Sequence, residues 1–185
     1  MQPQKRRTMS RSFRLDEQAL GTLNEEAAKR KISPNSLLNQ ILLDYCVFYR
    51  YLKDIPTITM TQDLFASIIG DCPEENVRLY GKQSGSMIAK DVLGVVGLDF
   101  NRENLVFYLE EILSRYANGF IYSHHVNDSG KDVFHLRHSM GEKWSIFLSE
   151  EISTLIECCS GEKVKTELTK NTVTIEVALE KKPRK

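Results

Sequence analysis

Residues 10–45 read SRSFRLDEQALGTLNEEAAKRKISPNSLLNQILLDY, and this stretch decides the N-terminal fold. Its first residues alternate in polarity, which predicts a strand with Phe13 and Leu15 on one face. The opposite face carries Ser10, Ser12 and Arg14. Asp16 follows as a helix N-cap, because an aspartate accepts hydrogen bonds from the free amides of a first helical turn. The stretch therefore predicts a strand that leads directly into a helix.

A second helix start follows within the same stretch. Ser33 is placed as the N-cap and Pro34 as the first helical residue. Apolar residues at helical spacing continue past Tyr45 to Leu52, so the second helix is expected to extend that far. Neither helix could bury its apolar face alone, and the strand has no partner in this segment. The sequence therefore predicts that a second copy of the chain completes the core.

The segments Ser12–Asp16 and Lys31–Asn35 resemble the strand and the turn of the ribbon-helix-helix family, the Arc and methionine-repressor type of DNA-binding protein. The family usually has Gly where this chain has Lys31. If that position needs a left-handed backbone, Lys costs about 1 kcal/mol relative to Gly.

This resemblance implies that two chains pair their strands and insert the ribbon into the major groove of DNA. Ser10, Ser12 and Arg14 would contact base edges, because Arg can bond bidentately to guanine and Ser can donate or accept. Phosphates would be contacted from the start of the second helix and from a basic arm by Ser33, Asn35, Lys5, Arg6 and Arg7. The implied partners are double-stranded DNA and a second copy, in a homodimer or a tetramer.

Charge and composition divide the chain in the same place. Residues 1–55 carry ten Lys or Arg against six Asp or Glu, whereas the whole chain carries 25 of each, so the remainder is acidic. We expect a DNA-binding domain at residues 1–54 and a regulatory or oligomerisation domain at residues 55–185. The segment 54–60 lacks Gly and Ser, which favours docked domains over a flexible tether.

The C-terminal part shows a helix–strand–strand pattern twice. Two such units predict a four-stranded antiparallel sheet with helices on one face, which is a two-layer α+β domain such as a permuted ferredoxin-like fold. A turn at residues 127–130 separates the first two strands. The expected helices are 61–69, 73–96 with a break left open at Gly81 or Gly85, 101–116 and 142–159, and the expected strands are 120–126, 132–137, 163–168 and 172–178.

All four histidines fall on or near the first hairpin: His124, His125, His135 and His138. Nickel-responsive regulators join a ribbon-helix-helix head to such a domain, so a metal site is one interpretation. The i, i+3 spacing of His135 and His138, with no Cys within ten residues, favours polar strand residues instead. We therefore predict no cofactor, with metal as the open alternative. An effector pocket is expected near His135, His138 and Trp144.

Signals for catalysis are scarce. Residues 81–85, GKQSG, lack the order of a phosphate loop, and neither a Gly-x-Ser-x-Gly elbow nor a Cys-x-x-Cys pair occurs. Four unpaired cysteines fit a cytosolic protein, and no apolar run reaches the ~20 residues of a membrane helix. The sequence thus predicts a non-enzymatic, DNA-binding transcriptional regulator of the prokaryotic cytoplasm. The alternative is an antitoxin-like protein whose C-terminal domain binds a partner protein.

Overall fold

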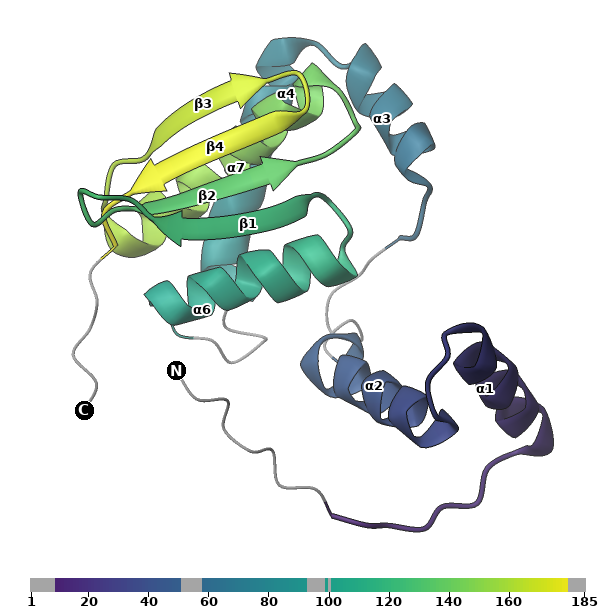
Figure 1. Ribbon diagram of the computed structural model, residues 1–185. Coiled ribbons are helices and arrows are strands. Elements are labelled where there is room, and N and C mark those ends of the chain that lie inside the picture. Colours follow the sequence, from purple (N-terminus) through teal and green to yellow (C-terminus); the bar gives the residue numbers. More distant parts are fainter. Residues whose placement is uncertain (1–8, 51–57, 93–98, 100, 180–185) are drawn as a thin grey trace. The chain divides into compact units, whose positions relative to one another are not determined.

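A computed structural model describes residues 9–50, 58–92, 99 and 101–179 of the chain. The chain divides into two compact units, Met1–Arg50 and Tyr51–Lys185. In chain order, with η for a π-helix, the elements are α1 (Glu17–Lys29), α2 (Pro34–Val47), α3 (Gln62–Asp71), α4 (Glu74–Met87), η2 (Ile88–Val92), α6 (Arg102–Phe107), η3 (Tyr108–Tyr116), β1 (Ile121–Val126), β2 (Asp132–Arg137), α7 (Glu142–Ser160), β3 (Lys165–Thr169) and β4 (Thr172–Val177) (Figure 1).

The N-terminal unit is a pair of helices that begin where the sequence places their caps. The Asp16 carboxylate accepts from the amides of Gln18 and Ala19, and the Ser33 hydroxyl accepts from the amide of Ser36. Between the helices Lys31 adopts a φ of 55°, which is the left-handed conformation considered for this position. Local capping chemistry therefore accounts for both helix starts.

The strand predicted before α1 is not present. Residues 9–15 have no regular secondary structure, and Phe13 and Leu15 are 67% and 44% exposed. The prediction of a ribbon-helix-helix head is wrong at this element, because the alternating side chains bury neither apolar residue. α2 ends at Val47, so the expected continuation falls short, and residues 51–57 lie outside the described part of the chain.

The C-terminal unit contains a four-stranded antiparallel sheet in the order β1-β2-β4-β3 (Figure 1). The expected turn joins β1 to β2, with Gly130 at a φ of 80° and the Asn127 side chain accepting from the amides of Ser129 and Lys131. In this register Val126 pairs with Asp132. Because strand residues alternate in direction, the register decides which histidines share a face.

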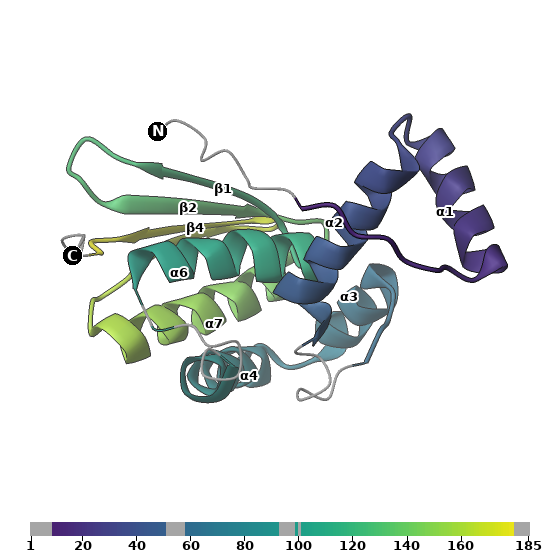
Figure 2. The same ribbon diagram turned by 90° about the horizontal axis from the view of Figure 1, so that it is seen from below.

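Helices cover one face of this sheet in two successive layers (Figure 2). α6, η3 and α7 lie against the sheet, where the buried strand residues include Phe134, Leu136, Val173, Ile175 and Val177. α4 packs on α7 and lies farther from the sheet. The predicted two-layer domain is therefore wrong, because α4 forms a third layer, and the structure is mostly helical with a C-terminal antiparallel sheet. Among the described helices, none is long and apolar enough to cross a bilayer.

Two glycines explain how α4 approaches α7 so closely. The helix runs unbroken from Glu74 to Met87, so neither Gly81 nor Gly85 ends it. A Cβ atom placed on Gly81 would lie 2.7 Å from the backbone oxygen of Phe147, and one on Gly85 would lie 2.2 Å from that of Glu151. These glycines therefore permit close contact between the two backbones.

Candidate functional site

A groove of about 620 Å³ lies between α1 and α2. Its residues recur at spacings of three and four along both helices, so one face of each helix lines it. The apolar lining consists of Ala19, Leu23, Leu37 and Ile41, and the uncharged polar lining of Gln18, Thr22 and Gln40. This arrangement resembles the open face of an incomplete helical bundle.

The charges along this groove are mostly negative. Asp16, Glu26 and Asp44 line it against one cation, Arg30. The Glu26 carboxylate also meets the ammonium of Lys29 at 2.7 Å, and this hydrogen bond holds the pKa of Glu26 below its ordinary value. Lys29 is well exposed, so solvent screens that pair. The groove thus combines an apolar floor with acidic edges.

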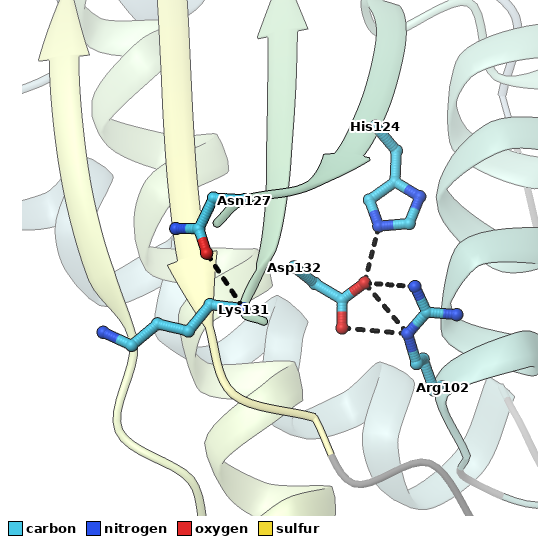
Figure 3. Close-up of polar contacts among 5 residues, drawn as sticks. All are labelled: Arg102, His124, Asn127, Lys131 and Asp132. Atoms are coloured by element: carbon cyan, nitrogen blue, oxygen red, sulfur yellow. Dashed lines mark hydrogen bonds and ion pairs between the residues drawn. The ribbon is translucent and has the colours of Figure 1, made fainter. Parts of the chain in front are cut away.

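A buried polar cluster forms the second candidate site, where α6 meets the start of β2 (Figure 3). Asp132 is 1% exposed, and Nε of Arg102 donates to both of its carboxylate oxygens at 2.9 Å. Nη2 of Arg102 and Nε2 of His124 also contact Oδ1 of Asp132, the latter at 2.7 Å. The carboxylate therefore connects α6, β1 and β2.

The electrostatics of this cluster favour the ion pair. Hydrogen bonding to Asp132 raises the pKa of Arg102 above its ordinary value, against the opposing effect of burial. The His124 ring stacks on Phe134 with ring centroids 4.7 Å apart, so its orientation is fixed from two sides. A carboxylate with two such partners is electrically satisfied without a ligand. The cluster therefore holds helix to sheet.

Tyr122 lies on β1 beside this cluster. Its hydroxyl oxygen is buried and has no hydrogen-bond partner among the described residues, and burial raises the pKa of the phenol. Ser153 on α7 carries a similarly buried, unpartnered hydroxyl. Each such group has lost its hydrogen bonds to water without replacement.

We expect Tyr122→Phe to raise the free energy of unfolding by about 1 kcal/mol, because the substitution removes an unsatisfied hydroxyl and keeps the ring. Urea denaturation followed by circular dichroism measures this change. Ser153→Ala serves as the matched variant and should shift stability in the same direction. A loss of stability in Tyr122→Phe would mean that its hydroxyl has a partner in solution.

The four histidines do not converge. His124 faces the helices, whereas His125 and His135 stack on the opposite face of the sheet with ring centroids 5.4 Å apart. Nδ1 of His135 lies 3.1 Å from the hydroxyl of Thr174. Nε2 of His138 meets the Ser145 hydroxyl at 2.9 Å, and burial lowers the pKa of His138.

An effector pocket was predicted near His135, His138 and Trp144. Trp144 is buried, donates from Nε1 to the carbonyl oxygen of Gly119 at 3.0 Å and stacks on Phe147. It is therefore a core residue. In the described part of the chain, no group of three or more His, Cys, Asp or Glu side chains could hold a metal ion.

The residues predicted to contact DNA are scattered. Ser10, Ser12 and Arg14 are exposed in a segment without regular structure. Ser33 caps α2 and Asn35 lies exposed in its first turn. The arm residues Lys5, Arg6 and Arg7 lie outside the described residues. The base-contact assignment depended on a ribbon that the described residues do not form.

Sequence reasoning missed the residues on which the C-terminal unit depends most. Asp132 is simply the first residue of a predicted strand, and Arg102 lies thirty positions earlier. The available signal was an acidic residue facing inward on a strand whose neighbours, Phe134 and Leu136, are apolar. An inward carboxylate requires a partner, and only the fold identifies which one.

Comparison with known proteins gives few matches. No protein-family model matches the chain, and no curated protein matches it. Among solved structures, an H-NOX protein from S. oneidensis in the Fe(II)NO ligation state is similar in fold, with a TM-score of 0.47 and 9% identity over 88% of this chain and 98% of that one. A likeness this distant does not reveal what the present chain binds.

The structure corrects the family and the function inferred from sequence. Residues 9–15 form no strand, so the recognition of the ribbon-helix-helix family is wrong. The predictions of a DNA-binding regulator, of its antitoxin-like alternative, and of DNA and a second copy as partners are withdrawn with it. The prediction that the chain lacks a cofactor is withdrawn as well.

Proposed function

We propose that this chain is a non-enzymatic interaction protein whose N-terminal helix pair binds an amphipathic helix of a partner protein. The observation that carries the proposal is the groove between α1 and α2, with its apolar floor of Leu23, Leu37 and Ile41. Helix-in-groove recognition uses apolar anchors at successive turns of the bound helix. Grooves that hold ligands typically measure about 300–1,000 Å³, so the 620 Å³ here accommodates several apolar side chains.

The apolar surface of the N-terminal unit supports this role. Helices of 13 and 14 residues are marginal by themselves, and of the described residues in this unit only Ala27 and Leu37 are buried apolar residues. Burying a large apolar side chain contributes about 1.5–3 kcal/mol. A docked helix would cover lining side chains that are otherwise wholly or partly exposed, among them Ile41 and Leu23. Contiguous apolar surface of this kind marks interaction sites.

Charge narrows the class of partner. The groove carries Asp16, Glu26 and Asp44 against Arg30. An occupant with Lys or Arg flanking its apolar stripe complements these edges, and an occupant with Glu there is repelled. We therefore assign the groove to a basic amphipathic helix. A cytoplasmic location is part of the proposal, supported by four free cysteines.

The test is binding of a labelled peptide to the full chain, measured by fluorescence anisotropy. The probe is a peptide of about 18 residues with Leu at helical spacing and Lys on its flanks, long enough to form a helix when bound. Ile41→Gln should weaken its affinity at least about tenfold, because the groove loses an apolar anchor. Ile41 is 49% exposed, so its replacement leaves the fold intact.

Leu43→Gln provides the matched control. Leu43 lies on the same helix and is 40% exposed, but it does not line the groove. The Leu43→Gln variant should bind the peptide as tightly as the parent chain does. A peptide with Glu in place of Lys should bind neither the parent chain nor this variant. Equal losses in both variants would contradict the proposal. A second contradictory result is self-association. The chain would then form oligomers in light scattering that Ile41→Gln disperses, and it would fail to bind the peptide, because another copy would occupy the groove.

A further inference from the structure

The contact between α4 and α7 places two adjacent carboxyl groups in opposite environments. Glu150 is 20% exposed in its side chain and faces two cations of α4, with Arg78 at 2.7 Å and Lys82 at 3.8 Å. Glu151 is 6% exposed, and within the described part of the chain the Ser84 hydroxyl donates a hydrogen bond to its Oε1 at 2.6 Å. Cations therefore compensate the charge of the Glu150 carboxylate, whereas Glu151 has no cation beside it among the described residues.

The surroundings of Glu151 supply no compensating cation within the described residues. On α4 the two cations that reach α7 pair with Glu150. Tyr108 of η3 interacts electrostatically with Glu151. Burial raises the pKa of this phenol, and the Glu151 carboxyl raises it further. Other charged groups on elements packed against α7 face elsewhere: Lys90 of η2 is exposed, and Lys165 and Glu167 of β3 pair with each other.

The close backbone contact between α4 and α7 makes this contact sensitive to a negative charge on Glu151. Gly85 brings α4 so close that an added Cβ would overlap the backbone oxygen of Glu151. Glu151 itself is only 6% exposed, so an ionised carboxylate there would be poorly hydrated. A charge on Glu151 can be solvated only if α4 moves away from α7.

We propose that Glu151 is a proton-operated latch between α4 and α7. With the carboxyl protonated, α4 stays closed against α7, where the Ser84 hydroxyl contacts the group. With the carboxyl ionised, α4 opens so that water reaches the charge. The only ligand required is a proton, and the latch is independent of the groove between α1 and α2.

The direction of the pH dependence follows from the burial of Glu151. Burial raises the pKa of this carboxyl from 4.5 to about 7, and the hydrogen bond from Ser84 lowers it by a smaller amount. Because the closed-state pKa lies above the open-state value, the closed state binds more protons between the two. Closure is therefore strongest below about pH 4.5 and weakens as pH rises through about 7.

Amide hydrogen exchange of α4 in the full chain, divided by the intrinsic exchange rate at each pH, measures the opening. We expect the opening constant to rise about tenfold per pH unit between about pH 5 and pH 7 and to level off above. Glu151→Gln cannot ionise and should make the opening of α4 independent of pH. Glu150→Gln is the matched control and should retain the full dependence.

Two outcomes would overturn the latch: a flat profile in the parent chain, or the same slope in Glu151→Gln as in the parent. Ser84→Ala gives a second measurement that keeps the titrating group. It removes the bond that favours the ionised carboxylate, so the pH at which opening levels off should move upward. An unmoved profile in this variant would contradict the latch, because it would show that the titrating group is not the carboxyl bonded to Ser84.

Discussion

Asp132→Ala is expected to lower the free energy of unfolding by about 3–5 kcal/mol. The substitution leaves the guanidinium of Arg102, only 17% exposed in its side chain, without its buried counter-ion. It also removes the acceptor of His124, so helix α6 and strand β1 each lose a side-chain contact with β2. Urea denaturation followed by circular dichroism measures the loss.

The matched control is Glu176→Ala in β4, at the position that pairs with Val133. Glu176 accepts from the ammonium of Lys131, and both side chains are open to water. Solvent screens such a pair, so stability should change little. A loss for Asp132→Ala no larger than that of the control would mean that the buried cluster does not hold the unit together.

Gly85→Ala is expected to have the second large effect. Its Cβ would lie 2.2 Å from the backbone oxygen of Glu151 and 3.0 Å from Cβ of Thr154. Neither atom belongs to the end of a flexible side chain, so α4 must shift away from α7. Overpacking of this kind costs about 1–3 kcal/mol, which thermal or urea unfolding resolves.

Gly70→Ala tests whether this effect arises from packing. Gly70 also lies in a helix, α3, but no atom lies within 4 Å of a Cβ added there. Alanine favours helix over glycine by up to about 1 kcal/mol, so this variant should be neutral or stabilising. Similar destabilisation by both substitutions would argue against a close α4–α7 contact.

Local signals in the sequence were sufficient for the starts of the helices. Asp16, Ser33, Thr61 and Asn101 each cap the helix that follows, as their residue types and positions predict. The hairpin turn at Asn127 was also predicted correctly. These features depend on hydrogen bonds within about four residues, so the sequence contains all the participants.

The predictions that failed concern contacts between distant residues. The order of caps and helices in residues 16–47 specifies a helix pair, but it carries no information about whether residues 9–15 pair as a strand. Gly81 and Gly85 suggested a break in a helix, because their role becomes visible only when α7 is placed beside them. The pairing of Arg102 with Asp132 likewise requires the fold.

Hydrogen exchange of the full chain with and without the Lys-flanked peptide tests the assignment of the groove most directly. The account predicts added protection of amides in α1 and α2, between residues 17 and 47, and none in the sheet β1–β4. The Glu-flanked peptide should change amide protection neither in α1 and α2 nor in the sheet. Protection confined to the C-terminal unit, or equal protection by the two peptides, would contradict a basic helix bound between α1 and α2.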